Sequence, residues 1–152
     1  MKKFIALDVK EYKLKKGIIP VNLTWKNNTI KDWCNKLKIN NKDIIIGHSL
    51  GAAIALIVAK KTPPKELHLY SPSPIFTETI KYLDDKNLKY FGKKRLKEIK
   101  IIPKVTCPVT IYVGGNEDRI MKLTAKKICA SLPHAKLIII PNKDHSSVIR
   151  NL

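Results

Sequence analysis

A serine lies between two glycines in the segment Gly47-His48-Ser49-Leu50-Gly51, after the apolar run 43–47 and before a second apolar run. The pattern G-x-S-x-G at a strand-to-helix turn is typical of a nucleophilic serine, because the tight turn lifts the hydroxyl clear of the sheet. Glycine fits at the two flanking positions, where larger side chains would collide. Ser49 is therefore the candidate nucleophile, and the Leu50 N–H at the helix start is a candidate oxyanion donor. The alternative is a glycine-bracketed turn with a bystander serine.

A serine nucleophile needs a base, and the chain has four histidines. His48 belongs to the turn itself and is expected to point differently from Ser49. His68 lies inside a predicted strand, which favours a packing role, and His134 lies in the loop SLPHAK, where it is expected to be solvated. His145 follows the last predicted strand, in a loop that can fold back over the carboxyl edge of a parallel sheet. The chain order serine, acid, histidine favours His145.

Three carboxylates compete to orient this histidine. Asp118 lies in the turn GGNED, after the predicted strand 109–113, and its position at a strand's carboxyl end makes it the predicted acid. Glu117 is its immediate neighbour and the nearest rival. Asp144 adjoins His145 and cannot easily reach round to the ring. The alternative for Asp118 is a turn aspartate or a helix N-cap.

These residues must be positioned by strands that alternate with helices. Apolar runs predict strands over 4–7, 18–23, 43–47, 66–70, 109–113 and 136–140. Helical patterns cover 30–38, 50–61 and 120–130, and one or two surface helices with a break near Gly92 cover 77–99. Pro20 favours an edge position or a bulge for its strand. The alternation predicts an α/β fold, a three-layer α/β/α sandwich around a mainly parallel sheet of about six strands.

From about Ile18 to His145 the chain resembles an α/β-hydrolase. The resemblance rests on GHSLGA at the nucleophile elbow, GGNED at the acid turn and NKDH at the histidine loop. It implies that Ser49 attacks a carbonyl carbon, that His145 acts as general base and then acid, and that Asp118 holds the imidazole. It implies no metal and no organic cofactor.

The sequence departs from the family pattern in three ways. The two leading antiparallel strands and the helix after the first retained strand are missing, and the cap insertion shrinks to about 75–106. The usual His-Gly turn is replaced by FIALDVKEY. The second oxyanion N–H would therefore come from Asp8 or Val9, with Val9 taken as the candidate. We expect one domain over residues 1–152.

The formal net charge of +18 raises nucleic acid or an anionic surface as possible partners. Nearly all of this charge is lysine, spread along the whole chain, so a compositional bias is the favoured explanation, and no specific nucleic-acid binding is expected. Three cysteines without metal or disulfide spacing, and no apolar run long enough to span a bilayer, predict a reduced, cytoplasmic protein. The oligomeric state stays open.

The sequence therefore predicts a serine hydrolase of small carboxylic esters or thioesters, acting through an acyl-enzyme on Ser49. One rival is a catalytically degenerate hydrolase fold that serves as a binding module, since the His-Gly turn is missing. The other is a nucleic-acid or anionic-surface binder, since the charge is so high.

Overall fold

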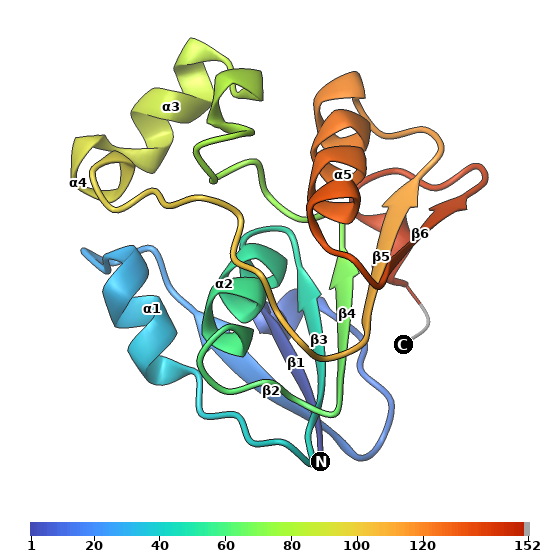
Figure 1. Cartoon of the computed structure of the whole chain (residues 1–152). Coiled ribbons are helices and arrows are strands. Elements are labelled where there is room, and N and C mark those ends of the chain that lie inside the picture. The colour runs from blue at the N-terminus through green and yellow to red at the C-terminus, as the bar shows by residue number, and fades with distance from the viewer. Residues whose placement is uncertain (151–152) are drawn as a thin grey trace.

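Six parallel strands form one sheet in the computed structural model, which describes residues 1–150 (Figure 1). Their order across the sheet is β2-β1-β3-β4-β5-β6. The strands are β1 (Lys2–Leu7), β2 (Ile18–Leu23), β3 (Ile44–His48), β4 (Glu66–Tyr70), β5 (Val109–Gly114) and β6 (Ala135–Ile140). The predicted α/β class and parallel sheet are confirmed, and Pro20 does lie on an edge strand, as the sequence favours.

Three helices pack on one face of the sheet (Figure 1). They are α1 (Ile30–Lys36), α2 (Leu50–Ala59) and α5 (Arg119–Ser131). Thr29 caps α1 through a capping box with Asp32. Helix α2 is buried over nearly its whole surface, because it lies over β1, β3 and β4 and is flanked by α1. The main apolar core lies between these helices and the strands.

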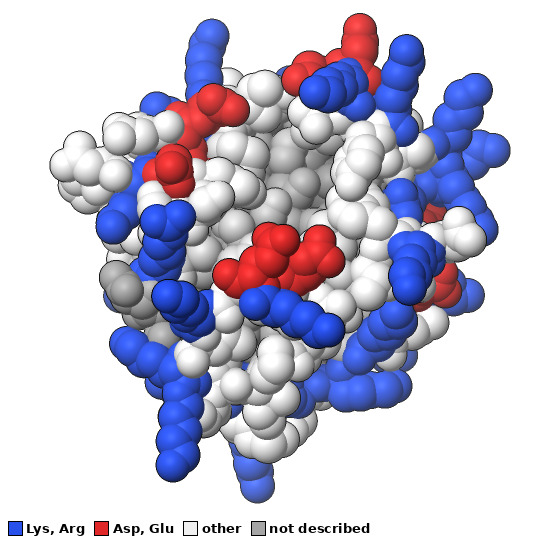
Figure 2. All heavy atoms as spheres, turned by 180° about the vertical axis from the view of Figure 1, so that it is seen from behind, with Lys and Arg blue, Asp and Glu red and all other residues white. Residues whose placement is uncertain are grey.

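The opposite face of the sheet has a thinner cover. Its smaller core joins Phe4 and Ile46 to Val148 and Ile149. Within residues 1–150 the regular elements that pack there are short 3-10 turns, η1 (Val9–Glu11) and η3 (Ser147–Ile149). The third layer of the predicted sandwich is therefore reduced to turns and loop. Figure 2 views the molecule from behind the helices and shows lysine and arginine side chains projecting around the rim.

The segment between β4 and β5 holds three short helical pieces, η2 (Ile80–Tyr82), α3 (Asp85–Phe91) and α4 (Lys93–Leu96). Gly92 separates α3 from α4 with a φ of 88°, at the predicted break. This segment falls within the stretch 75–106 expected to form a small cap. None of the helices in residues 1–150 is long and apolar enough to cross a membrane.

Candidate active site

Ser49 occupies a strained turn between β3 and α2. Its φ of 53° and ψ of −118° lie in a region that L-residues seldom adopt. Backbone hydrogen bonds hold it there: the Ser49 N–H donates to the Tyr70 carbonyl at 2.9 Å, and its own carbonyl accepts from the Ser73 N–H at 3.1 Å. The strain is thus sustained by β4 and the loop that follows it.

The flanking glycines are required by close backbone approaches. A Cβ on Gly51 would lie 2.1 Å from the Ile5 carbonyl oxygen, and one on Gly47 would lie 2.5 Å from the Ala52 Cα. Helix α2 can therefore begin this close to β1 only with glycine at position 51. The geometry has the features that the G-x-S-x-G pattern predicts.

His145 is paired with Glu117. The His145 Nδ1 lies 2.7 Å from the Glu117 Oε1. A carboxylate only accepts hydrogen bonds, so Nδ1 carries a proton and the Nε2 of the neutral ring is left as a free base. The imidazole is partly exposed, whereas the Glu117 side chain is fully buried.

The Glu117 carboxylate is held in place on its other oxygen. Its Oε2 accepts hydrogen bonds from the Ser71 hydroxyl at 2.5 Å and from the Gly114 N–H at 2.6 Å. Burial alone would raise the pKa of Glu117, but the hydrogen bonds from His145, Ser71 and Gly114 outweigh it and lower that pKa. Glu117 is therefore an ionised, buried partner for His145. Ser71 was not singled out from the sequence.

The pairing corrects the predicted acid. Asp118 is exposed and stands at the N-cap of α5, whereas its neighbour Glu117 is the buried carboxylate that contacts His145. A negative side chain there is favoured by the positive end of the helix. Asp144 is also occupied elsewhere, since its carboxylate accepts from the backbone N–H groups of Ser146 and Ser147. Of the three candidates, Glu117 alone contacts the imidazole.

The histidine loop is pressed against the acid turn. A Cβ on Gly114 would lie 2.1 Å from the Lys143 carbonyl oxygen, and the same oxygen accepts a hydrogen bond from the Asn116 N–H at 2.9 Å. Asn142, with a φ of 59°, reverses the chain after β6 so that the loop can return. These contacts bring His145 over the end of β5.

Ser49 and His145 are linked through His48, whose Nε2 lies 2.8 Å from the His145 carbonyl oxygen. The Ser49 hydroxyl itself makes no hydrogen bond to any residue of the described chain. In free enzymes the serine–histidine contact often tightens only when substrate binds. The structure therefore brings Glu117 and His145 into contact. Ser49 is the chain neighbour of His48, which bonds to the His145 carbonyl.

The two predicted oxyanion donors differ. Leu50 is the first residue of α2, so its N–H has no acceptor within the helix. The Val9 N–H instead donates to the Asn22 Oδ1 at 3.0 Å. The prediction that Val9 donates to the oxyanion is therefore corrected, because its N–H already bonds to a side chain of β2. Asp8, the other candidate, adopts a left-handed conformation with a φ of 52° directly after β1.

Comparison with solved structures identifies the fold. The chain superposes on MGS-MChE2, an α/β-hydrolase enzyme from a lagoon-sediment metagenome of Mar Chica, Morocco, with a TM-score of 0.65 and 20% identity over 95% of this chain and 81% of that one. Mouse α/β-hydrolase domain-containing protein 10 gives a TM-score of 0.66 and 15% identity, with the same coverage of both chains. The chain has the α/β-hydrolase fold.

A third similar structure is Est1E from Butyrivibrio proteoclasticus with ferulic acid bound, at a TM-score of 0.61 and 14% identity over 96% of this chain and 81% of that one. The chain spans 64% of the length of a similar Agrobacterium vitis S4 protein. No protein-family profile matches the sequence, and no curated protein matches it. This α/β-hydrolase fold is thus recognised by shape far more readily than by sequence.

The remaining two histidines, His68 and His134, take no part in the contacts around Glu117 and His145. His134 is exposed in its loop, as predicted. His68 is half-buried on the thinly covered face of the sheet, where its Nδ1 lies 3.2 Å from the Tyr112 hydroxyl and its ring stacks on that of Tyr112. Its packing role agrees with the sequence.

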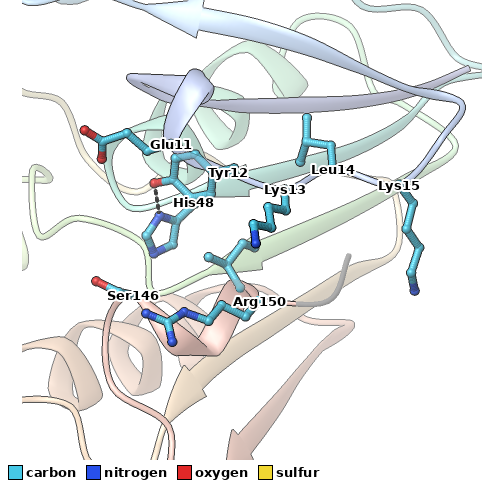
Figure 3. A pocket seen from close by; sticks show the side chains of 9 residues that line it. Glu11, Tyr12, Lys13, Leu14, Lys15, His48, Ser146 and Arg150 are labelled. Carbon is cyan, nitrogen blue, oxygen red and sulfur yellow. Dashed lines mark hydrogen bonds between the residues drawn. The ribbon is translucent and has the colours of Figure 1, made fainter.

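A cavity of about 840 Å³ lies beside His48 and Ser146 (Figure 3). It is lined by residues 11–15, His48, Ser146, Ile149 and Arg150. In Figure 3 the Lys13 and Arg150 side chains extend into the space between the two segments, whereas the Glu11 carboxylate points away from it. His48 and Ser146 are the chain neighbours of Ser49 and His145, which do not themselves line the cavity.

Proposed function

We propose that this protein is a serine hydrolase that cleaves small carboxylic esters or thioesters. Ser49 is the nucleophile, His145 the general base and then acid, and Glu117 the carboxylate that orients the imidazole. The observation that supports this most directly is the Glu117–His145 hydrogen bond at the sheet edge where the strained Ser49 turn also lies.

In the first half of the reaction the Ser49 oxygen bonds to the carbonyl carbon while its proton passes to the His145 Nε2. The carbonyl oxygen becomes an oxyanion, for which the Leu50 N–H and the positive end of α2 are the proposed stabilising groups. The imidazolium then protonates the departing alkoxide or thiolate, which leaves an acyl-Ser49. Water repeats the sequence and releases the acid. Glu117 stabilises the imidazolium in both halves without taking its proton.

The cavity beside the site suggests which small esters fit. Lys13 and Arg150 give it positive charge, and the guanidinium can bind a carboxylate through two parallel hydrogen bonds. We therefore propose that short esters bearing a negative charge are preferred substrates. The lysine-rich surface would draw them in at low ionic strength.

A fluorophosphonate probe tests the proposed nucleophile, because it labels only an activated serine. We expect covalent labelling of the peptide that contains Ser49 in the wild-type chain and no labelling in Ser49→Ala. A panel of p-nitrophenyl esters of increasing acyl length then reports the substrate class. Absence of both labelling and ester turnover would contradict the proposal.

The second candidate is a binding module on a degenerate hydrolase fold. The observation that favours it is the engaged Val9 N–H, which leaves the oxyanion site with fewer free donors. This candidate predicts an unlabelled serine but a functional cavity, so binding of a small dicarboxylate such as succinate without turnover would support it.

A further inference from the structure

His48 is bonded at both ring nitrogens although it belongs to no pair predicted from the sequence. Its Nδ1 lies 2.7 Å from the Tyr12 hydroxyl, and its Nε2 lies 2.8 Å from the His145 carbonyl oxygen (Figure 3 shows the first contact). The residue is 4% exposed. A buried ring with two short contacts has a fixed orientation.

The contacts also define where its proton lies. A carbonyl oxygen only accepts, so the His48 Nε2 must donate to His145. Burial, followed by the nearby His145 ring, lowers the pKa of His48 to about 4, so the ring is neutral at pH 7 and Nδ1 carries no proton. The Tyr12 hydroxyl therefore donates to Nδ1, which completes the hydrogen bonds of the tautomer that holds His145.

Tyr12 is itself anchored to the core of the sheet. Its ring packs edge-on against Phe4 of β1 at a centroid distance of 4.8 Å, and its N–H donates to the Val9 carbonyl at 3.1 Å. On the other side, the His48 and His145 rings lie 4.7 Å apart. A continuous chain of contacts thus runs from β1 through Tyr12 and His48 to the backbone of His145.

We propose that His48 is a positioning residue for His145, with Tyr12 as the donor that holds the His48 ring at Nδ1. The proposal rests on the proposed function, in which His145 is the base. The His145 side chain is 42% exposed, so packing alone restrains it weakly. Glu117 holds the ring at Nδ1, and His48 holds the backbone at the carbonyl. Both tethers are needed, because a shift of about 1 Å in a catalytic group can cost roughly 100-fold in rate.

The test compares two substitutions of one residue. His48→Phe keeps a ring of similar size but removes the donor to His145, whereas His48→Gln keeps an amide N–H that can reach the same carbonyl. We expect kcat for a p-nitrophenyl ester to fall roughly 10- to 100-fold in His48→Phe with KM nearly unchanged. His48→Gln should retain most of that kcat, and such rescue would not follow from a purely structural role.

Tyr12→Phe tests the outer end of the chain, with Tyr90→Phe as a matched control on the exposed surface of α3. We expect a several-fold loss of kcat in Tyr12→Phe and no change in Tyr90→Phe. Equal kcat values for wild type, His48→Phe and Tyr12→Phe, with all three folded by thermal denaturation, would overturn the proposal.

A measurement on the wild-type chain keeps this test separate from that of the proposed function. ¹⁵N NMR of the imidazoles reports which ring nitrogen is protonated, and we expect the His48 Nε2–H tautomer at pH 7. An Nδ1–H tautomer would overturn the positioning role whether or not the protein hydrolyses esters, and even if His48→Phe fails to fold. Failure of fluorophosphonate labelling with the Nε2–H tautomer present would overturn the proposed function alone.

Discussion

The Glu117 carboxylate and the His145 imidazole are joined at 2.7 Å, across 28 residues of chain and from the ends of two neighbouring strands. The contact exists because β5 ends in a turn that points Glu117 inward, while the loop after β6 returns over that turn. The Ser71 hydroxyl and the Gly114 N–H hold the same carboxylate through its second oxygen.

Ser49→Ala should abolish hydrolysis and leave the fold intact, since the hydroxyl makes no hydrogen bond within the described chain and its removal orphans no partner. Loss of a triad nucleophile costs roughly 10⁴- to 10⁶-fold in turnover. His145→Ala should produce a loss of the same order. Turnover of a p-nitrophenyl ester checks both, with Ser131→Ala on α5 as the control. Near wild-type turnover in Ser49→Ala would refute the nucleophile.

Glu117→Gln should depress activity strongly, by roughly 10⁴-fold where the wrong imidazole tautomer results. The amide has one acceptor oxygen, whereas the Gly114 N–H and the His145 Nδ1–H both need one. Asp118→Asn should change kcat/KM little, since Asp118 is exposed at the N-cap of α5. Steady-state kinetics of the two variants ranks them, and a larger loss in Asp118→Asn would reverse the assignment.

Gly114→Ala should displace the histidine loop, because its Cβ would lie 2.1 Å from the Lys143 carbonyl oxygen. Such overpacking typically costs about 1 to 3 kcal/mol of stability. Gly115→Ala is the matched control: its Cβ would meet neighbouring atoms no closer than 3.5 Å. Thermal denaturation and ester turnover should both separate the two variants, and equal behaviour would contradict the close approach.

Acid should destabilise the fold through His48 before it acts through the carboxylates. The pKa of His48 is about 4 in the folded chain against 6.5 for an unperturbed histidine, so the unfolded state binds a proton more readily between these values. Stability is therefore complete above pH 6.5 and falls as the pH drops towards 4, by about 3 kcal/mol.

Urea unfolding at several pH values measures this loss. His48→Gln should flatten the dependence between pH 6.5 and 4, whereas the exposed His134→Gln should leave it unchanged. The lowered pKa of Glu117 acts in a separate window, since its contribution is present above the usual glutamate pKa of 4.5 and is lost as the pH falls below it. An unchanged slope in His48→Gln would show that His48 titrates normally.

The sheet could be predicted because each of its signals is local. Continuous apolar runs mark buried parallel strands, and the proline in β2 marks the edge. The choice between Glu117 and Asp118 is different, because which of two adjacent turn residues is buried depends on the orientation of the turn, and the Gly114–Lys143 contact that orients it is long-range. One signal was available: an aspartate directly before a helix is typical of an N-cap.

The contacts of Tyr12 and Asn22 could not be read from the sequence. Tyr12 lies in a polar stretch without periodicity, and only the fold brings it against His48. Asn22 faces Val9 because β1 and β2 pair in parallel register, so the engaged N–H depends on that pairing. Long-range contacts of single polar side chains leave no local pattern.

Charge should distinguish the substrates of this site. Lys13 and Arg150 line the cavity, and the whole chain carries +18, so kcat/KM for a negatively charged short ester such as p-nitrophenyl hemiglutarate should fall as salt is added. The Debye length shrinks from about 30 Å at 0.01 M to about 3 Å at 1 M, which screens the attraction. The kcat/KM for the neutral p-nitrophenyl valerate should change little over the same range.

Lys13→Gln combined with Arg150→Gln should raise KM for the anionic ester alone, whereas the exposed Lys126→Gln on α5 should not. Parallel salt profiles for both esters, or an equal effect of the double variant on each, would mean that the positive charge of the cavity plays no part in substrate choice.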